Sequence, residues 1–159
     1  MTISRLDRVS VFGDKLSFLI PHEWVEDPDE GDDYLYHAPD TDSGWLRVSL
    51  ITAKNSSAKA RDLLAERARQ ESGKLYQLGQ NLIATWERSS QEDGVPIYQY
   101  WWAVLRSLGP DHSREALFSY TILADRRNHA ETRDTVSALS DLICAAEFSN
   151  PANSSVADK

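Results

Sequence analysis

The chain has 159 residues, of which 41% are apolar and 26% charged, and its formal net charge is −8. This length and composition are typical of one globular domain with its own hydrophobic core. No apolar run approaches the roughly 20 residues of a membrane-spanning helix, and no basic patch of the kind that nucleic-acid binding needs is visible. We therefore expect no membrane span and no nucleic-acid partner.

The cysteine content and the two chain ends suggest where the protein acts. One cysteine, Cys144, excludes an internal disulfide framework, which fits a reducing compartment. The first fifteen residues carry charges where a secretion signal would need its apolar centre. We predict a cytoplasmic protein with one domain over residues 1–150. The remaining residues, 151–159, are small and polar and are expected to form a disordered tail.

The negative charge is concentrated in one segment. Between Lys15 and Arg47 the chain has nine acidic residues and no Lys or Arg, and the rest of the chain is close to neutral. Such a segment is most often a solvated acidic loop. The alternative is a docking surface for a basic partner, because complementary charge accelerates encounter. The candidate partner-binding residues in this segment are Asp29, Glu30, Asp32 and Asp33.

The first third of the chain has the pattern of short strands. Strands are expected at residues 9–12, 15–20, 34–37 and 45–52. Gly13 and Asp14 separate the first two and are typical of a two-residue hairpin. In the fourth strand Leu46, Val48 and Leu50 share one face, which is the cleaner core face.

From Asn55 the apolar period changes to that of a helix. The apolar residues at helical spacing are Ala60, Leu63, Leu64 and Ala68. Asn55, Ser56 and Ser57 are three possible N-caps for this helix. Gly73 is well placed to end it in a left-handed conformation.

Strands resume in the second half of the chain, and a second helix follows them. The expected strands are 74–78, 81–89, 97–106 and 116–124, and their short connectors make neighbours antiparallel. Asn128 and Glu131 have the spacing of a capping box, and the helix is expected to end near Phe148. This order predicts an α+β domain in which an antiparallel sheet of about six strands is flanked by two helices, an α/β/α sandwich.

The segment YQYWWAVL, residues 98–105, carries large side chains on both strand faces. Tyr98, Tyr100 and Trp102 point to one side, and Trp101 and Leu105 point to the other. Because burial of each such side chain contributes about 1.5–3 kcal/mol, a central strand between two helices is the simplest interpretation. The alternative is that Tyr98, Tyr100 and Trp102 line an exposed groove for a partner, or are covered by a second copy in a homodimer.

No catalytic or metal-binding set is evident. His22, His37, His112 and His129 show no helical i, i+4 spacing and none is near Cys144 in sequence, so no zinc signature exists. The acidic loops do not have calcium-loop spacing, and there is no phosphate-binding glycine loop or nucleophile elbow. We predict no catalytic residue, no metal and no cofactor. The alternative is a small ligand-binding protein or enzyme that uses His22, His37 and nearby acids around a pocket.

Two stretches carry a resemblance to a known superfamily. LSFLIPHEWVE (16–26), an alternating strand followed by Pro21 and Trp24, resembles the opening of PsbP/Mog-like domains, which include DcrB-like proteins and the Eag-type chaperones of type VI secretion. ALFSYTILA (116–124), a short charged gap and a final helix closing with Phe148 are similar to the end of these domains. The resemblance covers about residues 9–149. It implies an antiparallel sheet between helices and a mostly non-catalytic, protein-binding role.

These observations together predict a non-catalytic cytoplasmic protein-binding module, similar to a secretion chaperone or adaptor. Its expected partner is a protein that presents an apolar or basic segment. The alternative within the binding class is an immunity-type inhibitor whose acidic surface blocks a basic toxin site.

Overall fold

The computed structural model describes residues 5–27, 31–40, 44–53 and 56–149. The helices are α1 (Ser57–Gln70) and α2 (Ala130–Cys144), with a single 3₁₀ turn, η1 (Ala124–Arg126), before α2. The strands are β1 (Leu6–Val11), β2 (Leu16–Pro21), β3 (Val25–Asp27), β4 (Tyr34–His37), β5 (Trp45–Ala53), β6 (Lys74–Leu78), β7 (Asn81–Glu92), β8 (Val95–Gly109), β9 (His112–Leu123) and β10 (Glu147–Phe148). The tail 151–159 lies outside the described residues.

The strands form two antiparallel sheets. A seven-stranded sheet has the order β3-β4-β5-β9-β8-β7-β6, and a three-stranded sheet has the order β1-β2-β10. The predicted α+β class, with an antiparallel sheet and two helices, is confirmed. The main sheet has seven strands where about six were expected, and the first hairpin belongs to the separate three-stranded sheet. After α2 the chain returns to pair Glu147 with Ser17, which fixes this hairpin to the end of α2 rather than to the large sheet.

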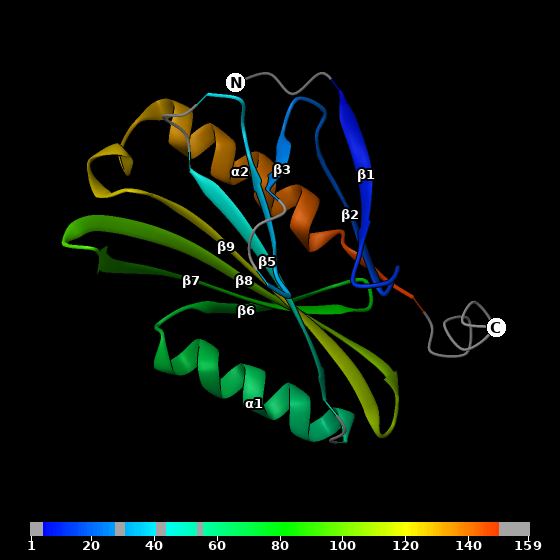
Figure 1. Ribbon diagram of the computed structural model, residues 1–159. Coiled ribbons are helices and arrows are strands. Elements are labelled where there is room, and N and C mark those ends of the chain that lie inside the picture. The colour runs from blue at the N-terminus through cyan, green and yellow to red at the C-terminus, as the bar shows by residue number, and fades with distance from the viewer. Residues whose placement is uncertain (1–4, 28–30, 41–43, 54–55, 150–159) are drawn as a thin grey trace.

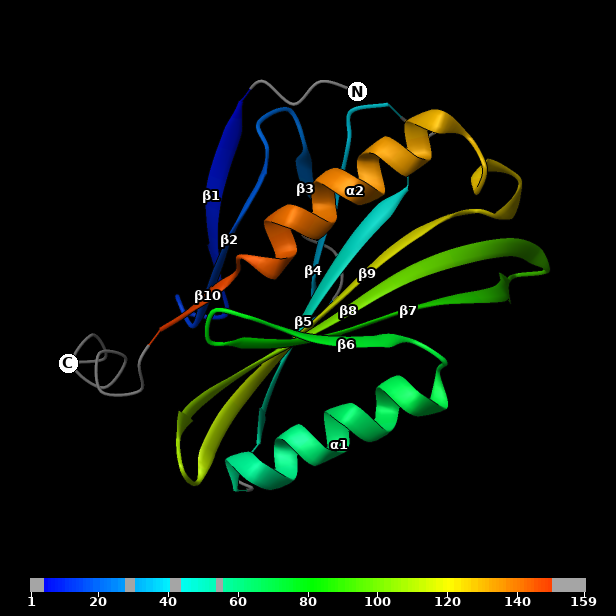
Figure 2. The ribbon, with the colours of Figure 1, turned by 180° about the vertical axis from the view of Figure 1, so that it is seen from behind.

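The two helices lie on opposite faces of the seven-stranded sheet. Figure 2 shows α2 crossing one face, with β1, β2 and β10 beside it, while α1 lies below on the other side. Phe18, Phe118 and Leu139 belong to the core on the α2 side. Leu64 and Leu105 belong to a second core under α1. The strand YQYWWAVL, in the middle of β8, therefore packs on both faces, as the simpler interpretation predicted: Tyr98 and Trp102 lie in the core on the α2 side, and Leu105 lies in the core under α1. Gln99 and Trp101 are only half-buried.

The ends of α1 differ in detail from the sequence-based expectation. Ser56 is the N-cap and accepts a hydrogen bond from the Lys59 N–H at 3.2 Å. Ser72, not Gly73, adopts the left-handed conformation, with a φ of 55°. Gly73 is needed for a different reason, because a Cβ atom there would lie 2.1 Å from the Thr85 carbonyl oxygen of β7. Leu63, one of the apolar residues at helical spacing, is 54% exposed, whereas Ala60, Leu64 and Ala68 are buried.

The limits of α2 also differ. Its N-cap is His129, and no side-chain cap hydrogen bond forms, so the capping box predicted at Asn128 and Glu131 is absent. The helix ends at Cys144 instead of continuing to Phe148, which forms β10. Extended pairing with β2 replaces the last expected helical turn.

The hairpin turns explain two further differences. Phe12, Gly13 and Asp14 are all left-handed, with φ of 56°, 61° and 63°, so the first turn is longer than the predicted two residues. Between β7 and β8 the turn is only Asp93-Gly94, with φ of 51° and 80°. This Asp-Gly pair suits a tight hairpin, so both strands extend further than their apolar pattern indicated.

Candidate binding surfaces

On the α1 side, the large sheet is covered over only part of its width. The helix packs against β6, β7, β8 and part of β9. In Figure 1, seen from the side opposite to α2, no helix stands in front of β5 and the adjoining length of β9. A hollow of about 390 Å³ lies on this uncovered part. We call it the open face and define it by Leu35, Trp45, Gln99, Trp101, Ser119 and Thr121.

The strand register explains why the open face is hollow. Thr121 of β9 pairs with Trp45 of β5 on one side and with Gln99 of β8 on the other. Ser119, two residues earlier, is paired with Trp101. The small side chains of β9 therefore run between two large indoles. Gln99 donates a hydrogen bond from Nε2 to Thr121 Oγ1 at 3.2 Å, which holds the floor of the hollow.

Both indoles of the open face are held by neighbouring rings. Trp45 is 43% exposed, and its ring lies 4.4 Å from that of His37. Trp101 is half-buried and stacks on Trp86 with a centroid distance of 5.9 Å. The Arg88 guanidinium lies 5.8 Å from the Trp101 ring. A large, preordered apolar surface is thus presented to solvent.

The rim of the open face is acidic. Asp27 and Glu92 line it, and Arg47, which also lines the hollow, is paired with Asp33 at 3.3 Å. Of the acidic residues predicted to bind a partner, Asp32 is exposed next to Asp33. Asp29 and Glu30 lie outside the described residues.

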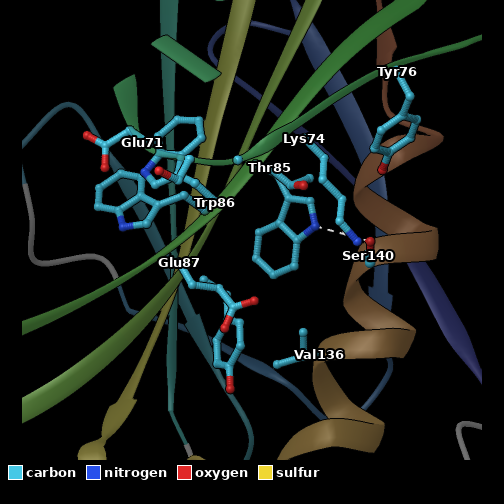
Figure 3. Close-up of a pocket in the computed structure, with 13 residues that line it drawn as sticks. Glu71, Lys74, Tyr76, Thr85, Trp86, Glu87, Val136 and Ser140 are labelled. Atoms are coloured by element: carbon cyan, nitrogen blue, oxygen red, sulfur yellow. Dashed lines mark hydrogen bonds between the residues drawn. The ribbon is translucent and has the colours of Figure 1, made fainter. Parts of the chain in front are cut away.

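A second hollow, of about 550 Å³, lies on the other face of the sheet where β6 begins. We call it the α2 hollow. Val136 and Ser140 of α2 lie across it from Glu87 of β7 (Figure 3). Its sheet side also includes Tyr100 and Trp102, and Trp102 donates from Nε1 to Ser140 Oγ at 3.1 Å. The hollow continues round the edge of β7 to Trp86 and Glu71.

Tyr98, Tyr100 and Trp102, the aromatic residues predicted to line an exposed groove, differ in how far they are buried. Tyr98 and Trp102 are only 6% and 3% exposed, so no open groove forms over all three. Tyr100 is half-buried and, with Trp102, lines the α2 hollow. Their role in partner binding stays a prediction. Trp45 and Trp101 were not among the predicted binding residues, because the sequence does not show which part of the sheet α1 leaves uncovered.

A hydrogen bond to Glu87 affects the ionisation of Tyr98. The Tyr98 hydroxyl donates to Glu87 Oε1 at 2.6 Å. Burial and this carboxylate raise the pKa of Tyr98 to about 12. Burial, together with Glu87, also raises the pKa of Tyr100. These phenols stay protonated at neutral pH and act as hydrogen-bonding groups.

His22, His37 and Cys144 are engaged in separate contacts. His22 Nδ1 lies 2.8 Å from Asp7 Oδ2, whereas His37 Nδ1 lies 2.7 Å from the Ala38 carbonyl oxygen. Cys144 is buried, and its Sγ lies 3.0 Å from the Tyr76 hydroxyl. Among the described residues there is no group of three or more His, Cys, Asp or Glu side chains that could hold a metal ion. None of the helices described is long and apolar enough to cross a membrane.

Comparison with known proteins identifies the fold. No family model and no curated protein sequence matches the chain. A protein of Bacteroides thetaiotaomicron superposes on 95% of the chain with a TM-score of 0.64 and 18% identity, but the chain spans only 50% of that protein. LpqN of Mycobacterium tuberculosis is described as involved in cell envelope biogenesis. It superposes on this chain with a TM-score of 0.59 and 13% sequence identity, and the match covers 91% of each chain.

The third similar structure is the E65A mutant of Mog1. It gives a TM-score of 0.54 and 10% identity over 94% of this chain and 99% of Mog1. Identities this low show the fold alone. The resemblance inferred from Pro21, Trp24 and the closing helix is confirmed at that level: the chain has the PsbP/Mog-like fold.

Proposed function

We propose that this protein is a non-catalytic binding module, similar to a secretion chaperone or adaptor, and that its open face binds a basic, amphipathic segment of a partner protein. The observation that carries the proposal is the pair of indoles, Trp45 and Trp101, held open over small side chains and rimmed by acids. The fold likeness to Mog1 and LpqN agrees with a binding role but does not specify a partner.

The apolar part of the open face supplies binding energy. Trp45 is 43% exposed, which leaves roughly 100 Å² of a side chain that can bury 150–250 Å². At about 25 cal/mol per Å², its complete burial under a partner contributes at most about 2.5 kcal/mol, or about seventyfold in Kd, and partial burial contributes proportionately less. His37 and the neighbouring strands hold the indole in place, so little conformational entropy is lost on binding.

The charge around the open face selects the partner. Strands β3 and β4, which form one side of it next to β5, belong to the segment between Lys15 and Arg47 that has nine acidic residues. Arg47, the basic residue that lines the hollow, is paired with Asp33. A basic partner is therefore attracted, and an acidic one is repelled.

The indoles of the open face and the acidic residues of the rim together require an amphipathic partner segment. A segment must place apolar side chains on Trp45 and Trp101 and direct Lys or Arg side chains toward the rim at Asp27 and Glu92. A helix with one apolar face and one basic face meets both conditions.

The proposal is tested by fluorescence anisotropy with two labelled 18-residue peptides of amphipathic helical pattern, one of Leu and Lys and one of Leu and Glu. We expect the Leu/Lys peptide to bind and the Leu/Glu peptide to bind at least tenfold more weakly. Trp45→Ala should weaken binding of the Leu/Lys peptide by about ten- to thirtyfold. Leu6→Ala is the matched control, because Leu6 is 39% exposed on the separate three-stranded sheet.

Two results would contradict the proposal. Equal binding of the two peptides would show that the acidic rim does not select the partner. Equal losses for Trp45→Ala and Leu6→Ala would show that the peptide binds to exposed apolar surface in general.

A further inference from the structure

The outer edge of β7 is only half covered by its neighbour. Strand β6 pairs with β7 from Lys74 opposite Thr85 to Leu78 opposite Asn81. The rest of β7, residues 86–92, has no strand on its outer side in the part of the chain that the structure describes. In Figure 2, β7 and β8 continue beyond β6 to their shared hairpin. Among the described residues, none pairs with β7 at this edge beyond Thr85.

The tight turns at both ends of β7 fix the direction of its backbone groups. Glu92 and Val95 close the two-residue turn that leads into β8, and Leu78 and Asn81 close the one from β6. In such hairpins the closing pair exchanges two hydrogen bonds, and bonding then alternates along the strand. Even-numbered residues of β7 consequently bond to β8. The backbone N–H and C=O groups of Glu87, Ser89 and Gln91 point outward from the free edge.

The α2 hollow lies beside this free edge. A further hollow of about 370 Å³ continues from it along α2, lined by Tyr100, Val136 and Ser140 together with Arg133 and Asp141. The helix and the free edge thus form the two walls of one groove. A strand added to β7 would direct every second side chain into the groove, where Tyr100 and Trp102 form the sheet side.

Charge indicates which side chain would enter the hollow. Glu87 is exposed and shares the hollow with the faces of Tyr100 and Trp102. A Lys or Arg directly opposite Glu87 would form a cross-strand ion pair and lay its stem over these rings. An acidic side chain at the same position would meet Glu87 as a like charge.

We propose that the free edge of β7 is a strand-addition site for an extended segment of a partner protein that places a Lys or Arg opposite Glu87. Main-chain hydrogen bonds to Glu87, Ser89 and Gln91 provide affinity, and the α2 hollow provides selectivity. This site uses the edge of β7 and the α2 side of the sheet, whereas the open face lies on the α1 side, although Trp101 lines both hollows. The argument for strand addition does not rest on the function proposed above.

The test uses a blocked nine-residue peptide of alternating Thr and Val with one central Arg, added to the ¹⁵N-labelled protein. Amide hydrogen exchange of Glu87, Ser89 and Gln91 should slow at least tenfold at saturating peptide. Exchange of Arg88 and Ser90, whose amides already face β8, should not change. Slowing that is absent, or uniform over residues 86–92, would overturn the proposal.

Backbone and charge controls separate strand addition from other modes of binding. Two versions of the peptide carry N-methyl groups on alternate backbone amides, so that each version has one of its two strand edges blocked. The version whose blocked edge faces β7 should fail to bind. A central Glu in place of Arg should weaken binding about tenfold. Glu87→Gln should abolish that difference, whereas Asp62→Asn, at an exposed acid of α1 outside both hollows, should not. Undiminished binding of both N-methylated peptides would overturn the proposal. So would protection that grows with protein concentration alone, because a second copy would then occupy the edge.

Discussion

Replacing Asn81 with alanine tests how α2 is fixed to the sheet. Asn81, the first residue of β7, is only 3% exposed. Its Nδ2 donates to the carbonyl oxygens of Cys144 and Ala146, at 3.2 and 3.0 Å, and its Oδ1 accepts from Arg106 Nε at 3.0 Å. These contacts satisfy carbonyl groups at the end of α2 that no further helical turn can satisfy.

The magnitude follows from the three hydrogen bonds. Each contributes about 1 kcal/mol net, so Asn81→Ala should lower the free energy of unfolding by about 3 kcal/mol. For a chain of 159 residues this corresponds to a fall in Tm of about 6–12 °C. Urea denaturation followed by circular dichroism and by tryptophan fluorescence would measure both the midpoint and the slope.

The matched control is Gln77→Ala on the neighbouring β6. Gln77 is also an amide with hydrogen bonds, to Arg61 and to the Gly79 carbonyl oxygen, but it is exposed. Its loss should cost less than about 0.5 kcal/mol. If Asn81→Ala costs no more than Gln77→Ala, the bonds to Cys144 and Ala146 do not hold the helix, and the reasoning is refuted.

Three further predictions concern the sheet and the open face. Gly73→Ala places a Cβ against the Thr85 carbonyl oxygen and should cost about 1–3 kcal/mol in urea denaturation; a loss below about 0.5 kcal/mol would show that the chain relaxes freely there. Folding raises the pKa of Tyr98 to about 12 from a usual value of 10, so its stabilising effect is complete below pH 10 and is lost as the pH rises toward 12. In the Tyr98→Phe variant, the free energy of unfolding should therefore fall less steeply between pH 10 and 12 than in the unsubstituted protein. Equal pH dependence of the two proteins would contradict this. Association of the Leu/Lys peptide, measured by stopped flow, should slow at least tenfold from 50 to 500 mM NaCl, whereas a constant rate would exclude electrostatic attraction.

Local patterns in the sequence were sufficient to predict most of the elements. The alternating apolar pattern of residues 45–52 and 116–124 predicted two strands, which are β5 and β9 in the structure. The helical spacing from Ala60 to Ala68 predicted α1. These patterns depend on which side of one element is apolar, and that can be read within a few residues. The combination of strands and helices then indicated the α+β sandwich.

Features that depend on distant segments were missed. The pairing of Phe148 with Leu16 joins the two ends of the fold, and nothing near either residue indicates it. Likewise, the alternation in β8 placed Tyr98 and Trp102 on one face and Trp101 on the other, but it could not show which face a helix covers completely. That depends on the position of α1 across the sheet, which leaves Trp45 and Trp101 at its uncovered part.

Turn geometry was also hard to predict from residue type. Gly73 looked like a left-handed helix end, yet Ser72 takes that conformation and Gly73 allows close approach of Thr85. A glycine is compatible with both roles, and only the neighbouring strand decides between them.

The five tryptophans allow a direct test of partner binding at the open face. Their indole N–H signals in a ¹H–¹⁵N spectrum report on separate places: Trp45 and Trp101 on the open face, Trp86 beside them under α1, and Trp24 and Trp102 in the core on the α2 side. On titration with the Leu/Lys peptide, the signals of Trp45 and Trp101 should shift most, while those of Trp24 and Trp102 should stay in place. Shifts confined to Trp24 or Trp102, with Trp45 and Trp101 unchanged, would contradict binding at this surface.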